Sequence, residues 1–167
     1  MITIKETSKE DLKNIQMLWA DGDVMRYVGF PEGYHETDEA MRDWLDWLDS
    51  KRPMANHYSI YEGGKYCGET NYIIDTDHRS ASLDIKLFAF ARGRGIAAQA
   101  VRHSIEQAFA NGAETVWVDP DPQNAKAIAL YERLGFKLKT MPEHVIALGE
   151  GPTENIYYEL GRNERKN

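Results

Sequence analysis

This chain of 167 residues has one cysteine, no excess of basic residues and no long apolar run. Because Cys67 has no partner within the chain, an internal disulfide framework and a cysteine-rich metal site are excluded. Such usage is typical of a reducing compartment, so we expect a cytoplasmic protein. No apolar run approaches the roughly 20 residues that span a bilayer, and the N-terminus does not resemble a signal peptide. A membrane partner is therefore not expected.

Basic residues are outnumbered, because 20 Lys and Arg stand against 27 Asp and Glu, giving a formal net charge of −7. Nucleic acid is not expected as a partner, since a phosphate backbone binds basic surfaces. An acidic balance favours a cationic substrate, or else it serves solubility alone. No metal site is predicted, because the histidines are scattered without ligand spacing: His35, His57, His78, His103 and His144.

Periodicity predicts a mixed α/β domain with the element order βααβββαβαββ. The expected strands cover 2–6, 57–61, 65–75, 81–90, 115–118, 136–139 and 155–160. The expected helices begin near Ser8 and Thr37 and cover 95–110 and 124–134. We expect one domain over residues 1–161, with a mostly antiparallel sheet flanked by helices. The remaining residues, 162–167, are predicted to be a polar, frayed tail.

The predicted strand at 81–90 leads directly into the helix at 95–110. Its side chains alternate between two faces, with Leu83, Ile85 and Leu87 on one face and Asp84, Lys86 and Phe88 on the other. The connection reads Arg92-Gly93-Arg94-Gly95-Ile96-Ala97. A helix N-terminus binds anions, and glycines let the backbone approach a ligand closely. This segment is predicted to cradle a pyrophosphate, the alternative being a tight turn with solvated arginines.

Two motifs resemble those of the GCN5-related N-acetyltransferase (GNAT) family. Arg92, Gly95 and Ala97 match its (Gln/Arg)-x-x-Gly-x-(Gly/Ala) cofactor loop, and residues 124–136 match its Asn-x-x-Ala-x-x-x-Tyr-x-x-x-Gly-Phe signature. The expected element order agrees with that family over nearly the whole chain, residues 20–55 being the divergent part. The resemblance implies acetyl-CoA as cosubstrate and direct attack by a primary amine, without a covalent acyl-enzyme.

The resemblance also implies a cofactor site along the strand end, the loop and the second motif. Its residues would be Leu87, Phe88, Ala89, Arg92, Gly93, Arg94, Gly95, Ile96, Ala97, Asn124, Ala127 and Tyr131. A backbone N–H on the strand at 87–89 would bind the oxyanion. Asn124 would hydrogen-bond the pantetheine arm, and it is also a plain helix N-cap.

Two catalytic residues are expected. Tyr131 would serve as the general acid for the departing thiolate; by position alone it is a core aromatic. Asp119 is the first candidate for the base. The run Asp119-Pro-Asp-Pro-Gln-Asn resembles the corresponding run in aminoglycoside 6′-N-acetyltransferases, which carries the acid that serves as base there. The alternative is that Asp119 is a turn residue before proline. Asp84 and Glu69 are further candidates, and a water relay is another.

The acceptor remains open at this point. A polyamine or aminoglycoside suits the acidic balance, whereas residues 23–29 look a little like ribosomal-protein acetyltransferases, which modify protein N-termini. The loop at 27–34 offers aromatic faces to a cation. The helix acids Asp43, Asp46 and Asp49 add negative charge or form a solvated face. A non-catalytic CoA-binding sensor is the rival class, and the protein is expected to be a monomer or homodimer.

Overall fold

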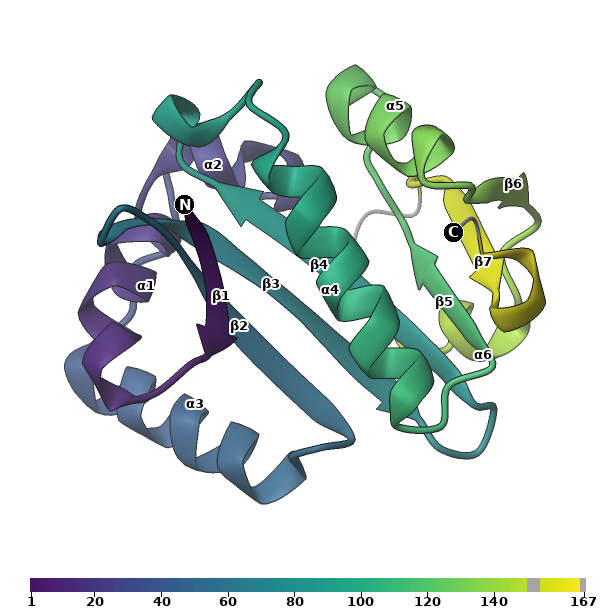
Figure 1. Cartoon of the computed structure of the whole chain (residues 1–167), viewed down its shortest axis with the longest axis horizontal. Helices are drawn as coiled ribbons and strands as arrows, with labels where there is room; N and C mark the ends of the chain where they lie inside the picture. The colour runs from purple at the N-terminus through teal and green to yellow at the C-terminus, as the bar shows by residue number, and fades with distance from the viewer. Residues whose placement is uncertain (150–153, 166–167) are drawn as a thin grey trace.

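A computed structural model describes residues 1–149 and 154–165 and contains one seven-stranded sheet (Figure 1). The strands are β1 Ile2–Glu6, β2 Ala55–Glu62, β3 Lys65–Asp75, β4 Ser80–Leu87, β5 Thr115–Val118, β6 Lys137–Lys139 and β7 Tyr157–Gly161. Their order across the sheet is β1-β2-β3-β4-β5-β7-β6, and only the β4–β5 pair is parallel. The predicted mixed, mostly antiparallel sheet is thus confirmed.

Six helices complete the described part of the chain, and most begin where the sequence predicts. They are α1 Leu12–Trp19, α2 Gly22–Met25, α3 Asp38–Lys51, α4 Ile96–Ala110, α5 Ala125–Arg133 and α6 Glu143–Ile146. The Thr37 hydroxyl caps α3 by accepting the Ala40 N–H at 3.1 Å. The helix expected from Ser8 begins instead with a 3-10 turn, Lys9–Asp11, before α1. Neither α2 nor α6 was predicted, because four residues are too few to show a helical period.

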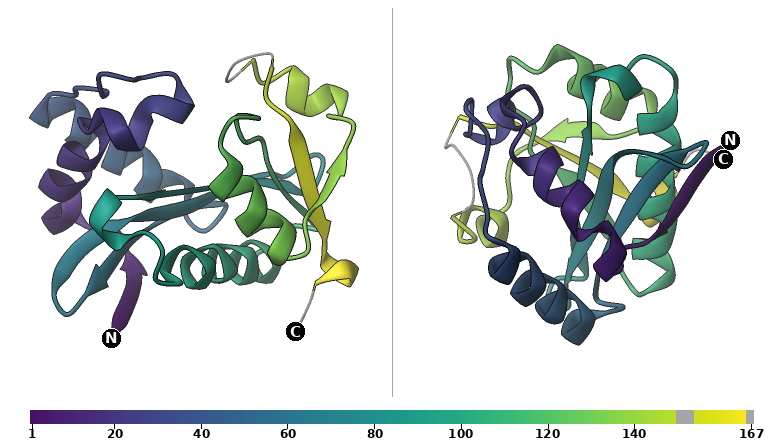
Figure 2. Two further views of the ribbon diagram at one scale, coloured as in Figure 1. Left: turned by 90° about the horizontal axis from the view of Figure 1, so that it is seen from above. Right: turned by 90° about the vertical axis from the view of Figure 1, so that its left-hand side faces the viewer.

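The helices cover opposite faces of the sheet, with α4 on one face and α1 and α3 on the other (Figure 2). On the α4 face, strand residues such as Tyr58, Tyr72 and Leu83 share a buried core with Val101 and Ile105. This burial of apolar side chains supplies most of the driving force for folding. The other face of β2–β4 carries polar side chains, and it is treated below.

The parallel pair β4–β5 is short, and the two strands separate after it. Only residues 80–82 of β4 pair with 115–117 of β5, whereas β4 continues to Leu87 alongside β3 alone. Figure 1 shows β4 and β5 diverging toward their C-terminal ends, with α4 and α5 following them. The fold therefore brings the loop before α4 and the start of α5 to the same end of the sheet.

The first residues of the predicted tail are tied to the domain. Arg162–Glu164 form a 3-10 turn, and the Arg162 guanidinium donates to the carbonyls of Phe109 and Ala113 at 2.6 and 2.7 Å. This part therefore does not fray as expected, while 166–167, like 150–153 of the predicted domain, lie outside the described residues. Among the helices that are described, none has the length and apolar character needed to cross a membrane.

Candidate active site

The loop between β4 and α4 takes a backbone shape that favours glycine. Gly93 and Gly95 have φ angles of 78° and 80°, in the left-handed region where side chains are strained. A Cβ built on either residue meets no other atom within 4 Å, so the space in front of the loop is free of protein. Gly95 is the residue before α4, whose first N–H groups have no partners within the helix. The loop therefore fits the predicted pyrophosphate cradle.

The two arginines of this loop are paired with acids, although both side chains remain accessible to solvent. Arg92 donates to the Asp23 carboxylate at 2.8 Å and to the Leu87 carbonyl at 2.9 Å. Arg94 lies 2.6 Å from a carboxylate oxygen of Glu62. Their charge is thus largely compensated within the protein, and the Arg92 guanidinium fixes the turn at the end of β4. Anion binding here must rest mainly on backbone N–H groups and the dipole of α4.

The end of β4 differs from the prediction. The strand stops at Leu87, the last residue of the β3–β4 ladder, so the expected strand at 87–89 is wrong beyond that residue. The Phe88 N–H donates to the Cys67 carbonyl at 3.0 Å, which leaves it engaged. Ala89 opens a 3-10 turn, Ala89–Ala91, where its N–H has no partner within the turn. Of residues 88 and 89, Ala89 is thus the better candidate for the oxyanion donor.

The remaining cofactor candidates are placed by α4 and α5. The Ile96 side chain is buried among apolar neighbours, so only its backbone N–H can face a ligand. Ala97 is half-buried at the first turn of α4. The Asn124 Oδ1 accepts the Ala127 N–H at 3.3 Å, which is the N-cap role. Hydrogen bonding of Asn124 to a pantetheine arm stays a prediction.

Tyr131 lies in the core between α5 and the sheet, and its ring centroid is 5.6 Å from that of Phe136. Burial, together with the carboxylates of Asp84 and Asp119, raises the pKa of its hydroxyl well above the usual value of 10. The Tyr131 hydroxyl therefore keeps its proton at neutral pH, so it is available as a proton donor.

Those two acids come from different elements. Asp84 is on β4 and remains partly exposed, with 39% of its side chain accessible. Asp119 follows β5 directly, and its carbonyl accepts the Asn155 side-chain N–H at 2.8 Å. The charges of Asp84 and Asp119 both act on the Tyr131 hydroxyl, although the three residues are up to 47 residues apart in the sequence.

We call the side of β2–β4 that faces away from α4 the polar face; it carries His57, Ser59, Glu69, Asn71, Asp84 and Lys86. Strand register sets Glu69 opposite Lys86 and Asn71 opposite Asp84. Glu69 is 2% exposed, and its carboxylate lies 2.7 Å from His57 Nε2 and 3.0 Å from Trp19 Nε1. These partners, with Lys86, outweigh burial and lower the pKa of Glu69 to about 2. Glu69 is therefore not placed to take a proton from a substrate.

Replacing Glu69 with glutamine should cost about 3 kcal/mol of unfolding free energy at pH 7, because the mostly buried Lys86 ammonium loses its anion. The folded pKa, about 2, lies below the ordinary value of 4.5, so this stabilisation is present above pH 4.5 and lost as pH falls toward 2. Urea unfolding at pH 7 and pH 3 should show the deficit shrinking. The exposed pair of Glu106 with Arg165 supplies the control, since Glu106→Gln should cost under about 1 kcal/mol. A deficit independent of pH would contradict this account.

Only some of the aromatic residues and acids that were predicted to bind the acceptor lie close together. Phe30 and Tyr34 contact each other, with ring centroids 5.0 Å apart, and both remain exposed. Trp44 is half-buried and packs against His57 and Trp19. The acids of α3 point to solvent, as the alternative of a solvated face expects: Asp43, Asp46 and Asp49.

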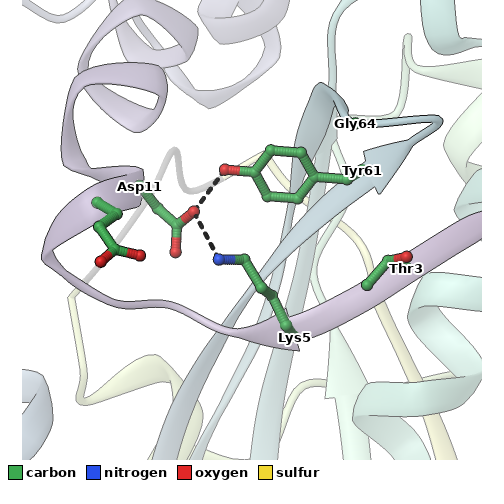
Figure 3. A pocket seen from close by; sticks show the side chains of 6 residues that line it. Thr3, Lys5, Asp11, Tyr61 and Gly64 are labelled. Carbon is green, nitrogen blue, oxygen red and sulfur yellow. Dashed lines mark hydrogen bonds and ion pairs between the residues drawn. The ribbon is translucent and has the colours of Figure 1, made fainter.

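A shallow pocket lies elsewhere, where β1 and β2 meet the 3-10 turn before α1 (Figure 3). Asp11 lines it and is fully buried, while Lys5 and the Tyr61 hydroxyl point toward its carboxylate, at 3.3 and 2.5 Å. Because the Asp11 carboxylate is already bonded to Tyr61 and Lys5, it is not a candidate for binding a ligand. The described residues also hold no group of three or more His, Cys, Asp or Glu that could bind a metal.

Comparisons with known proteins agree with this geometry. A family model described as an acetyltransferase (GNAT) domain matches residues 2–137. The spermidine N(1)-acetyltransferase of Escherichia coli K12 is 25% identical over 142 residues, covering 83% of this chain and 74% of that protein. The [ribosomal protein bS18]-alanine N-acetyltransferase of Salmonella typhimurium is 33% identical over 67 residues, covering 40% of this chain and 45% of that protein.

A solved structure shares the fold over nearly its full length. The spermidine N-acetyltransferase of Vibrio cholerae, in complex with CoA and spermine, has a TM-score of 0.76 at 18% identity and covers 98% of this chain and 96% of that one. Since the family model matches most of the chain, the chain belongs to the GNAT acetyltransferase family and is a transferase. The resemblance seen in the two motifs is thereby confirmed.

Two parts of the site were beyond the sequence prediction. The partners of the loop arginines, Asp23 and Glu62, are 69 and 32 residues away from them in the sequence. The cluster of Glu69, His57 and Lys86 was also missed, although the alternation of 81–90 placed Asp84 and Lys86 on one face. Glu69, an acid in the middle of the predicted strand at 65–75, was the remaining signal.

Proposed function

We propose that this protein transfers the acetyl group of acetyl-CoA to the primary amine of a cationic small molecule, by direct attack of the amine. The observation that carries the proposal is the glycine loop before α4, where Gly93 and Gly95 leave free space in front of the helix N-terminus. The buried Tyr131, whose hydroxyl feels the charges of Asp84 and Asp119, supports it. Bound acetyl-CoA supplies the activated acetyl group.

The protein's own residues then have separate tasks. The N–H groups at the start of α4 bind the pyrophosphate, and Gly93 and Gly95 allow its close approach. The Ala89 N–H stabilises the oxyanion. Tyr131 gives its proton to the departing thiolate sulfur, and its raised pKa keeps that proton available at neutral pH.

The acceptor amine must arrive near Asp84 and Asp119 and lose a proton before it attacks. A free alkylamine has a pKa near 10, so the site has to favour the minor, neutral form. We keep Asp119 as the first candidate for the base, with Asp84 as the second, because both carboxylates act on Tyr131. Either one would also attract a cationic substrate.

One observation favours a second acceptor, a protein N-terminus. The relative that acetylates the alanine of a ribosomal protein is 33% identical, although over only 67 residues. The spermidine acetyltransferase aligns over a longer span, 142 residues, and it supports the small cationic amine. An intact Tyr131 and Asn124 speak against a non-catalytic CoA sensor.

A panel of acceptors tests the choice, with CoA release measured as free thiol. We expect turnover with spermidine or another polyamine, weaker turnover with an aminoglycoside, and little with peptides that begin with alanine. A monoamine and a neutral alcohol of similar length serve as controls, because they lack the second charge or the nucleophilic nitrogen. Preferential turnover of the peptides would replace the proposed acceptor with a protein N-terminus.

A further inference from the structure

Lys86 has two acidic neighbours on the polar face and little access to water. Its ammonium nitrogen contacts the Asp84 carboxylate and lies 3.5 Å from Glu69 Oε1, and 13% of its side chain is exposed. The strand register explains this position, because Lys86 is directly opposite Glu69 on β3 and two residues from Asp84 on β4. Lys86 therefore bridges a fully buried acid and a partly exposed one.

The buried end of this bridge is fixed from behind. Glu69 is held by His57 at 2.7 Å and by Trp19, and His57 Nδ1 in turn lies 2.7 Å from the Thr7 hydroxyl. With Glu69 immobilised, Lys86 has a fixed anchor. The exposed end of the bridge, the Asp84 carboxylate, is then the part that can face a substrate.

The charges on this face decide which form of an amine it favours. A lone Asp84 carboxylate would hold an acceptor as its ammonium ion, which cannot attack a thioester. A second positive charge close by opposes that, because like charges disfavour protonation of the neighbour. Lys86 supplies such a charge permanently, since its two acids raise its own pKa above the ordinary value of 10.5.

We propose that Lys86 is a positioning residue for the acceptor: anchored on Glu69, it orients the Asp84 carboxylate and favours the neutral, reactive form of the amine bound there. This inference rests on the proposed function, since it requires an amine acceptor. Lys86 itself transfers no proton and forms no bond. The charged and titratable groups around it are Asp84, Glu69, His57 and Tyr66, with Tyr131 and Asp119 beyond Asp84.

The test compares pH profiles of kcat at saturating spermidine in the wild type, Lys86→Met and Lys86→Arg, because kcat reports ionisations in the enzyme–substrate complex. Removing the charge raises the pKa of the bound amine, so less of it is neutral at a given pH. The rising limb of the Lys86→Met profile should move up by about one pH unit or more. Activity should fall about tenfold at pH 7 and recover toward the wild type near pH 10, whereas Lys86→Arg keeps most of the wild-type profile.

Further variants separate a charge effect from a folding defect. Lys86→Gln removes the charge but keeps a donor for Glu69, and it should show the same shift if Lys86→Met does not fold. Lys137→Met is the matched control, because Lys137 pairs with Glu164 at 2.8 Å on an exposed edge, and its profile should not move. Acetyl-CoA affinity, measured by calorimetry, should be unchanged in every variant.

The outcomes separate this inference from the function on which it rests. Wild-type turnover with an unshifted profile in both Lys86→Met and Lys86→Gln overturns the role of Lys86 alone. A uniform loss at all pH values, with Lys86→Arg equally impaired, also overturns it and assigns Lys86 a structural role. Absence of amine acetylation by the wild type overturns the proposed function and this inference together.

Discussion

Replacing Gly95 with tryptophan is expected to weaken acetyl-CoA binding at least about 100-fold, which corresponds to roughly 3 kcal/mol. The indole would occupy the space in front of the loop, where a Cβ at present meets no protein atom within 4 Å. It would also displace the backbone N–H groups that the pyrophosphate needs. Calorimetric titration of the wild type and the variant measures the loss directly.

The substitution also strains the backbone, since Gly95 has a φ angle of 80°. Gly64 provides a matched control, because it has a φ angle of 82°, no neighbour within 4 Å of its Cβ, and a position in the turn between β2 and β3. Both tryptophan variants should lose similar stability, about 1–2 kcal/mol. Only Gly95→Trp should lose the cofactor. Equal affinities in the two variants would show that the loop is not the cradle.

Replacing Tyr131 with phenylalanine is expected to lower kcat about 100-fold, while the affinity for acetyl-CoA and the KM for the amine change little. The substitution removes only the hydroxyl and keeps the buried ring, so stability should fall by no more than about 1 kcal/mol. General acid catalysis commonly contributes 10²–10⁴-fold, so the expected loss is at the lower end. Steady-state kinetics with a polyamine measures it.

The pH dependence gives a second check on Tyr131. Its folded pKa is raised above 10, so the proton is retained throughout the neutral range and kcat should not fall up to about pH 10. Tyr72→Phe is the control, since the Tyr72 hydroxyl donates to the Pro53 carbonyl at 2.9 Å, far along β3. That variant should lose about 1 kcal/mol of stability and keep kcat. A Tyr131→Phe enzyme with wild-type kcat would make this tyrosine a core residue only.

The sequence predicted the elements that carry strong local signals. Alternation identified the strands around the polar face, and cap residues placed the starts of α3 and α5 at Thr37 and Asn124. It failed where the outcome depends on a neighbour in space. The end of β4 is set by where β3 stops pairing, and no local pattern in 81–90 encodes that limit.

The same distinction applies to the site. Motif residues such as Gly95 and Tyr131 could be predicted because the family pattern fixes their spacing. The ion pairs of the loop arginines could not be predicted, because Arg92 and Arg94 meet their acids only after the chain folds. The placement of Lys86 beside Glu69 needed the strand register. The exposure of Asp84, compared with the burial of Glu69, then showed which acid can face a substrate.

The central claim is that this protein moves an acetyl group from acetyl-CoA to the nitrogen of a cationic amine. The most direct measurement is mass spectrometry of a reaction containing the protein, acetyl-CoA and spermidine, with the intact protein and the free CoA quantified in the same samples. The account predicts one acetylated nitrogen for each CoA released and no acetyl group on the protein at any time. CoA release without acetylated spermidine, or a protein-bound acetyl group that precedes the product, would contradict it.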